Sequence, residues 1–290
     1  MSAATLHWIP GHAGRLCVHD WPRPESARAL VLIVHGLGEH AGRYENVAQR
    51  LLALGCAVRA YDHPGHGQSD GARGTLQARD GLLQDLAQVL DHTRAQSWAR
   101  GLPLVLLGHS MGGLVAARAV ADGLRPIDGL ILSSPALGTW ATPFQKFLVQ
   151  VLPGLVPRLC VANGLDPRAI ARDPAVVAAY QADPLVHDRI SARLGEWIQN
   201  EGPRTVAQAG QWRVPTLLLY AGADRLVRPE ASRDFARAAP ALVQSACFEP
   251  MFHEIFNDPE RDQVWVRIGA WLNAPAVFSA AATTSPEPVR

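Results

Sequence analysis

Short apolar runs alternate with amphipathic segments along most of this chain, and this alternation constrains the fold more than any other feature. All but the last of the apolar runs are continuous, which is typical of parallel strands covered by helices on both faces. The predicted strands are residues 29–34, 57–61, 103–107, 129–132, 216–220 and 244–248. The predicted helices are residues 44–54, 80–99, 113–122, 229–238 and 259–272, the last two starting at a proline. The pattern predicts a doubly wound, mostly parallel α/β sheet.

Residues 136–213 break this alternation, because they contain many prolines and no clear strand. Within them, residues 143–161 are strongly apolar. We expect a helical insertion that covers the sheet as a cap, with residues 1–135 and 214–273 forming the core domain. The tail, residues 274–290, is rich in Ala, Thr, Ser and Pro and is expected to be disordered.

Composition and charge exclude several classes of protein. The chain has 27 Lys and Arg against 26 Asp and Glu, so it offers no electrostatic footprint for nucleic acid. Its four cysteines form no C-x-x-C pair, and we therefore expect no zinc site, no disulfide scaffold and no cofactor. No signal peptide is visible, and no stretch reaches the roughly 18 apolar residues of a membrane span. We expect a cytoplasmic protein.

A glycine-rich turn follows the predicted strand at residues 103–107. The turn reads Gly-His-Ser-Met-Gly-Gly and places Ser110 between a strand and a helix. This is the G-x-S-x-G pattern in the strand–turn–helix context that exposes a serine hydroxyl as a nucleophile. The same turn directs the backbone N–H of Met111, at a helix N-terminus, toward a developing oxyanion.

A serine needs a base, and two histidines lie downstream of Ser110. His187 falls in the predicted cap, where we expect a solvated side chain. His253 follows the last predicted strand, on a loop that enters the final helix. The order serine, acid, histidine along the chain is the one found for this motif, and it favours His253 as general base.

An acid is expected after a strand between the serine and the histidine. Asp224 follows the buried run 216–220 and a glycine turn, where it can accept the His253 ring N–H and fix its tautomer. Asp128 precedes its strand and so lies at the wrong end of the sheet, and Asp183 lies in the cap. Asp224 is the predicted acid.

The second oxyanion donor is expected on the loop after the strand at residues 29–34. The N–H of Leu37, next to a glycine, fits this role. His35 and His40 precede the serine in the chain, and we interpret both as residues that order this loop.

With these residues assigned, the chain resembles the monoacylglycerol lipase branch of the α/β-hydrolases, which includes bacterial lysophospholipases and esterases. The Gly-Glu-His-x-Gly-Arg-Tyr and Asp-Pro-Leu pieces are its more specific motifs. The matching segments are residues 35–40 with 42–44, 62–67 with Ser69, 108–113, 133–136, 182–185, and 221–224 with Val227.

The resemblance implies an α/β-hydrolase fold with a helical cap that receives an acyl chain and touches membranes or micelles transiently. It implies oxyanion donors at Leu37 and Met111, and contacts to a glycerol head at Glu39, Arg43 and Tyr180. From the residues alone, Glu39 and Arg43 could instead pair with each other on a surface loop, and Tyr180 could pack within the cap.

Two classes of function remain open. The first is a serine hydrolase of single-chain lipid esters such as monoacylglycerols, with lysophospholipase or short-chain esterase as variants on the same triad. The second is a silent binding protein on a hydrolase scaffold, which would be expected to lack a member of the triad. The filled positions Ser110, Asp224 and His253 favour the enzyme. A peptidase is disfavoured because no acidic cluster for a substrate amine stands out in the cap.

Overall fold

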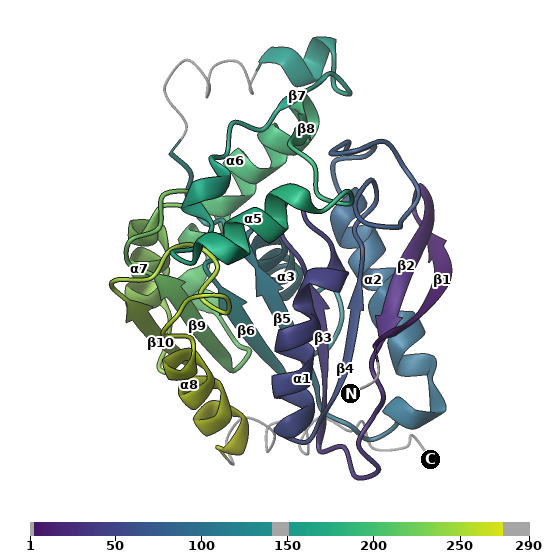
Figure 1. Ribbon diagram of the computed structural model, residues 1–290, viewed down its shortest axis with the longest axis vertical. Coiled ribbons are helices and arrows are strands. Elements are labelled where there is room, and N and C mark those ends of the chain that lie inside the picture. The colour runs from purple at the N-terminus through teal and green to yellow at the C-terminus, as the bar shows by residue number, and fades with distance from the viewer. Residues whose placement is uncertain (1–2, 141–150, 275–290) are drawn as a thin grey trace.

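The computed structural model describes residues 3–140 and 151–274, and in this part of the chain eight strands form one sheet. The sheet order is β1-β2-β4-β3-β5-β6-β9-β10, and the last six strands are parallel (Figure 1). Strand β2 runs antiparallel to both β1 and β4. The strands are β1 (Thr5–Gly11), β2 (Gly14–Asp20), β3 (Ala29–Val34), β4 (Cys56–Tyr61), β5 (Leu104–His109), β6 (Gly129–Ser133), β9 (Thr216–Ala221) and β10 (Val243–Phe248).

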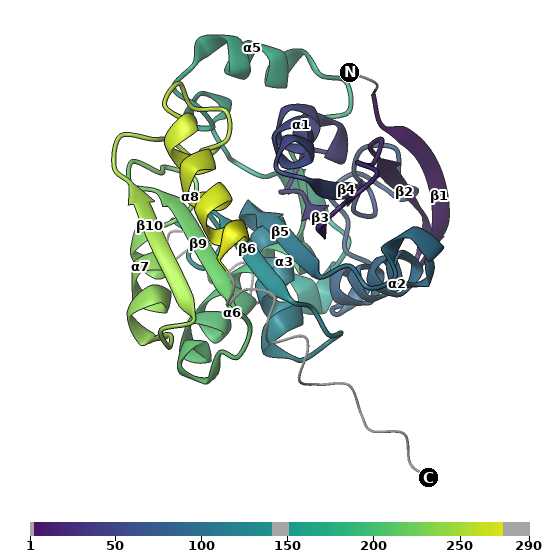
Figure 2. The same ribbon diagram turned by 90° about the horizontal axis from the view of Figure 1, so that it is seen from below.

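Helices cover both faces of the sheet. Helices α1 (Glu45–Ala53) and α8 (Asp262–Asn273) lie on one face, and α2 (Gly81–Ala95), α3 (Ser110–Ala121) and α7 (Pro229–Ala238) lie on the other (Figure 2). Alternate side chains of β3 therefore enter two separate cores, Leu32 on the α3 side and Val31 on the α1 side. The predicted doubly wound α/β sheet is confirmed.

The segment between β6 and β9, called the cap below, contains two strands that were not predicted, and α5 and these strands lie above the sheet in its described part (Figure 1). Strands β7 (Cys160–Ala162) and β8 (Arg189–Ser191) form a separate antiparallel pair. The expectation of no strand in this segment is therefore wrong, because a three-residue strand leaves no readable pattern. The helices of this segment are η3 (Pro167–Ala169), α5 (Pro174–Ala182), α6 (Ala192–Ala207) and η4 (Ala209–Gln211). Residues 143–150 of the apolar run lie outside the described residues.

Several other expectations are corrected at their boundaries. The helix predicted from residue 113 begins at Ser110, because the nucleophile turn is itself its first turn. The helix predicted to start at Pro259 begins at Asp262. The helix predicted to reach residue 99 ends at Ala95 and is followed by η2 (Ser97–Ala99), and η1 (Ala41–Tyr44) precedes α1. The N-terminal hairpin of β1 and β2 was not predicted, and residues 275–290 of the expected disordered tail lie outside the described residues.

The fold gathers four loops at one edge of the sheet. Parallel strands β3, β5, β9 and β10 end at the same edge, which lies beneath α5 and the β7–β8 pair (Figure 1). The predicted oxyanion donor, serine, acid and histidine each follow one of these strands. Side chains that are far apart in sequence are therefore brought together.

Glycine 112 provides a test of the packing beneath this edge. A Cβ at Gly112 would overlap the carbonyl oxygens of Val34 and His35, whereas one at Gly269 would make an ordinary 3.6 Å contact with Leu54. Both glycines lie in helices, where alanine is intrinsically favoured by about 1 kcal/mol. Gly112→Ala should therefore lower the melting temperature and Gly269→Ala should raise it, as measured by thermal denaturation. Equal stability of the two variants would contradict the close contact at Gly112.

Candidate active site

Ser110 lies at the sharp turn between β5 and α3. Its φ of 53° is one of two positive values among non-glycine residues in the described part of the chain. A Cβ at Gly108 would come within 2.6 Å of the carbonyl oxygen of Gly112, so the turn requires glycine at this position. The predicted turn is present, and the strained backbone holds the serine at the strand end.

The two predicted oxyanion donors lie on either side of Ser110. Met111 is in the first turn of α3, where backbone N–H groups have no partner within the helix. On the other side, the loop that carries Leu37 passes so close that a Cβ at Gly36 would lie 3.2 Å from the Cβ of Ser110. Both Leu37 and Met111 line a cavity that contains Ser110.

His253 and Asp224 form a buried pair. The His253 Nδ1 atom lies 2.7 Å from Asp224 Oδ2, and the two residues are 4% and 5% exposed. The other oxygen of Asp224 accepts hydrogen bonds from the N–H groups of Leu226 (2.8 Å) and Val227 (3.0 Å). The aspartate is therefore held in place, and it can orient the imidazole with Nε2 free to accept a proton.

The environment raises the pKa of His253. Burial opposes the charged imidazolium, but the attraction of the Asp224 carboxylate and its hydrogen bond outweigh this effect, and Glu254 and Glu39 add to it. The neighbouring ring of His109, 4.7 Å away between centroids, stays neutral because burial lowers its pKa to about 4. His253 is thus a stronger base than a free imidazole.

Two cavities of different character meet at Ser110 and His253. The larger, of about 910 Å³, is lined mainly by apolar side chains from the cap and the core, including Leu152, Leu159, Val161, Leu165, Ile198 and Val227. The smaller, of about 570 Å³, is lined mainly by polar ones, including Glu39, Arg43, Arg73, Tyr180, Asp183 and Glu254. The serine therefore faces an apolar space on one side and a polar space on the other.

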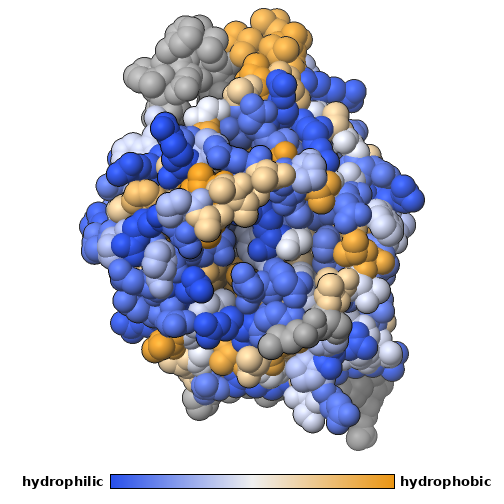
Figure 3. All heavy atoms as spheres, in the orientation of Figure 1, coloured by the Kyte–Doolittle hydropathy of each residue, from blue (hydrophilic) through white to orange (hydrophobic). Residues whose placement is uncertain are grey.

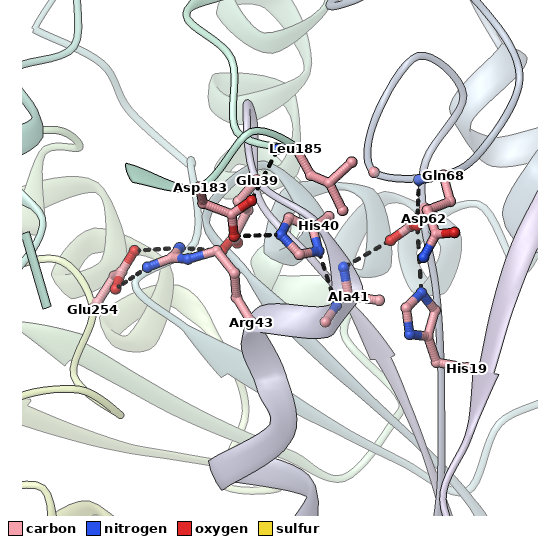
Figure 4. A network of polar contacts seen from close by, with 12 residues as sticks. His19, Glu39, His40, Ala41, Arg43, Asp62, Gln68, Asp183, Leu185 and Glu254 are labelled. Carbon is pink, nitrogen blue, oxygen red and sulfur yellow. Dashed lines mark hydrogen bonds and ion pairs between the residues drawn. The ribbon is translucent and has the colours of Figure 1, made fainter. Parts of the chain in front are cut away.

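Glu39, Arg43 and Tyr180 come together in the polar cavity, but the charged groups of Glu39 and Arg43 are already paired. Arg43 Nη1 donates to Glu39 (2.6 Å) and to Glu254 (2.7 Å) (Figure 4). The Arg43 guanidinium also lies 4.7 Å from the centre of the Tyr180 ring. The alternative pairing of Glu39 with Arg43 is present, but its expected place on the surface is wrong, since Glu39 is only 4% exposed. Glu254 was not predicted, because its partner Arg43 is 211 residues away in the chain.

Other histidines near the site contact the cap or link neighbouring loops of the core. His187 is half-buried, and burial lowers its pKa to about 4, so the expectation of a solvated side chain is wrong. Its ring lies 4.6 Å from that of His66. His40 contacts Asp183 of the cap at 2.8 Å (Figure 4). His35 links the loop after β3, which carries Leu37, to the loop after β4, because its Nε2 accepts the His63 N–H at 2.9 Å.

One cluster in the described residues has the spacing of metal ligands. Cys17, His19 and Asp62 each place one ligand atom within 4.8 Å of the others. The carboxylate of Asp62 also accepts hydrogen bonds from the N–H groups of Ala41 and Gln68, each at 2.8 Å (Figure 4). None of the three side chains lines either cavity, and we interpret the cluster as support for the loops below the site.

Comparison with known proteins agrees with this geometry. A family described as Serine aminopeptidase, S33 matches residues 25–260. The chain belongs to this family. It is 34% identical to a monoacylglycerol lipase of Mycolicibacterium smegmatis, over 93% of this chain and 98% of that protein. It is 32% identical to the human monoglyceride lipase, over 97% and 93%.

A solved structure extends the likeness. The crystal structure of Paleococcus ferrophilus monoacylglycerol lipase superposes with a TM-score of 0.79 at 37% identity, covering 89% of this chain and 98% of that one. The protein is therefore a monoacylglycerol lipase-like α/β-hydrolase, a serine hydrolase of carboxylic esters. Among the described residues, no helix is long and apolar enough to cross a membrane.

The His253–Asp224 pair leads to a prediction about how ester hydrolysis depends on pH. The base must be neutral to act, so ester hydrolysis should fall as the pH drops through a His253 pKa that lies above its usual value. Asp224→Asn removes the attraction but not the burial, and should move this acid limb to lower pH while slowing the reaction by about 10⁴-fold. The profile of kcat/KM against pH measures both effects.

Because the pair acts as a unit, Asp224→Asn combined with His253→Ala should cost little more than His253→Ala alone. Additive losses, or an acid limb that does not move in Asp224→Asn, would contradict the pairing.

Proposed function

We propose that the protein is a monoacylglycerol lipase, which hydrolyses esters of one fatty acyl chain and a small neutral polar head. The observation that carries this proposal is the pair of cavities that meet at Ser110. The apolar cavity suits one acyl chain, and the polar cavity suits the alcohol that leaves. The additional chains of a triacylglycerol would have to occupy the polar side, where burying them against charged groups is unfavourable.

The proposed reaction proceeds through an acyl-enzyme. His253 takes the proton of the Ser110 hydroxyl as its oxygen attacks the ester carbonyl, and Asp224 stabilises the resulting imidazolium. The N–H groups of Leu37 and Met111 hold the oxyanion of the tetrahedral intermediate. The intermediate collapses as His253 returns the proton to the leaving alcohol. Water then repeats the sequence and releases the fatty acid and free Ser110.

We further propose that residues 136–213 form a functional unit, a cap that brings lipid to the serine. Several apolar side chains near the β7–β8 pair are exposed, and Leu155 is the most exposed at 75%. Figure 3 shows an apolar patch on this part of the surface, at the top of the molecule. The large apolar side chains that are exposed in the segment 151–165 are Val151, Leu155, Val156, Leu159, Val161 and Leu165. An exposed apolar surface next to the acyl cavity would bind a micelle or bilayer and admit one acyl chain.

A series of monoacylglycerols of increasing chain length tests the substrate. Each methylene that enters the apolar cavity adds about 0.8 kcal/mol, or about fourfold in kcat/KM, until the cavity is filled. We expect activity to rise from acetate to medium chains, and to be lower on lysophospholipids and triacylglycerols. Ser110→Ala, which should lose both turnover and labelling by a fluorophosphonate, serves as the blank. A profile that does not change with chain length would leave a general esterase.

Leu155 tests the role of the cap surface. Leu155→Asp should weaken binding to lipid vesicles and slow hydrolysis of micellar substrate, while hydrolysis of a short soluble ester stays unchanged. Val266→Asp is a matched control, because Val266 is 70% exposed on α8, away from the cap (Figure 1). Equal behaviour of the two variants on vesicles would contradict membrane contact through the cap.

A further inference from the structure

Arg43 joins two loops that hold opposite parts of the active site. Its guanidinium contacts Glu39 through Nη1 (2.6 Å) and makes a two-pronged contact with Glu254 through Nη1 (2.7 Å) and Nη2 (2.9 Å) (Figure 4). Glu39 belongs to the loop after β3 that carries Leu37 (the oxyanion loop), and Glu254 belongs to the loop after β10 that carries His253 (the histidine loop). One side chain therefore spans the gap between them.

Each of the two carboxylates is fixed next to a reacting group. Glu39 Oε1 accepts a hydrogen bond from the backbone N–H of Gly36 at 2.6 Å. Gly36 directly precedes Leu37, the proposed oxyanion donor. Glu39 Oε1 also accepts the Tyr44 hydroxyl at 2.7 Å. Glu254 directly follows His253 in the chain. The position of Arg43 is thus transmitted to the oxyanion donor on one side and to the base on the other.

The cap is attached to the same junction. The backbone N–H of Glu254 donates to the carbonyl oxygen of Ile170 at 2.7 Å, and the ring of Tyr180 lies 4.7 Å from the Arg43 guanidinium. Both Ile170 and Tyr180 belong to the segment above the sheet. The junction therefore joins three parts of the molecule: the oxyanion loop, the histidine loop and the cap.

Burial makes this junction costly to break and rigid when intact. The side chains of Arg43, Glu39 and Glu254 are 11%, 6% and 7% exposed. Although burial alone would raise it, the pKa of Glu39 falls to about 2, chiefly because of the charge of Arg43. All the carboxylate oxygens are in use, since Glu254 Oε2 also accepts from Asn257 at 2.8 Å. The carboxylates are committed to holding structure.

We propose that Arg43 is a positioning residue, which fixes the Leu37 oxyanion donor relative to the His253 base by bridging Glu39 and Glu254. This inference rests on the proposed ester hydrolysis, because it assigns how that site is held together. It replaces the sequence-based expectation of direct head-group contact for Glu39 and Arg43. Of the three residues expected to contact the head group, Tyr180 lines the polar cavity and makes no hydrogen bond through its hydroxyl among the described residues. Burial raises the pKa of Tyr180 to about 12.

The junction also sets the charge around His253. Asp224, Glu254 and Glu39 favour the imidazolium, Arg43 offsets the last two, and His109 stays neutral. Removing the positive charge of Arg43 leaves the carboxylates of Glu39 and Glu254 uncompensated near His253, which favours the imidazolium. Removing the negative charge of Glu254 takes away one of the carboxylates that favour the imidazolium. The two changes should therefore shift the titration of His253 in opposite directions.

Arg43→Gln, Glu254→Gln and a matched control, Arg172→Gln, test the proposal. Arg172 also makes a two-pronged pair with a carboxylate of the histidine loop, Asp258 (2.6 and 2.8 Å), but it does not reach the oxyanion loop. We expect Arg43→Gln to lower kcat by about 10- to 100-fold, less than the loss of a whole oxyanion donor, with KM nearly unchanged. Arg172→Gln should keep kcat close to wild type even where it lowers the melting temperature.

The pH profiles provide a readout that a purely structural role would not produce. The acid limb of kcat/KM should move to higher pH in Arg43→Gln and to lower pH in Glu254→Gln, and should stay in place in Arg172→Gln. Arg43→Lys keeps the charge but not the planar fork, so it should retain the wild-type limb with a reduced kcat. If Arg43→Gln does not fold, Glu254→Gln and Arg43→Lys decide the question.

The outcomes separate this inference from the proposed function. Wild-type protein that neither hydrolyses esters nor reacts with a fluorophosphonate would overturn the function itself. An active wild type, with Glu254→Gln and Arg43→Lys matching it in kcat and in the position of the acid limb, would overturn the positioning role of Arg43 and leave the function intact.

Discussion

The first turn of α3 lies directly against the carbonyl oxygens at the end of β3, and the geometry of the site depends on this contact. Gly112 allows it, because any side chain there would push the helix away from the sheet. The contact places Ser110 and the Met111 N–H beside the loop that carries Leu37. The proposed nucleophile and oxyanion donors thus follow two neighbouring strands, and the proposed acid and base follow β9 and β10.

Much of the fold could be predicted because the central strands are short, apolar and buried on both faces. Strand β3 and helix α7 have the predicted boundaries, and the triad order follows from which strands end in polar loops. The β1–β2 hairpin was missed because β1 has few apolar positions and only one buried residue, Ile9. Strands β7 and β8 were missed because three residues carry no period.

Within the site, sequence order was enough to predict that Ser110, Asp224 and His253 lie together, but it did not predict the charges around them. Arg43 and Glu254 are adjacent only after the sheet has folded, so their spacing in the chain does not predict the pair. The same reason explains why His187 was expected to be solvated. It is half-buried beside His66, which lies on a loop of the core more than a hundred residues earlier. Side-chain networks of this kind depend on tertiary packing.

The separation of the two cavities has a consequence for the order of events in the proposed cycle. While the acyl chain stays on Ser110, it occupies the apolar space, so the polar space is the path left for the second reactant. The departing alcohol and the incoming water then use the same path, through the polar cavity. Water can take its place beside His253 only after the alcohol has gone, and the two half-reactions are kept apart in time by the shape of the site.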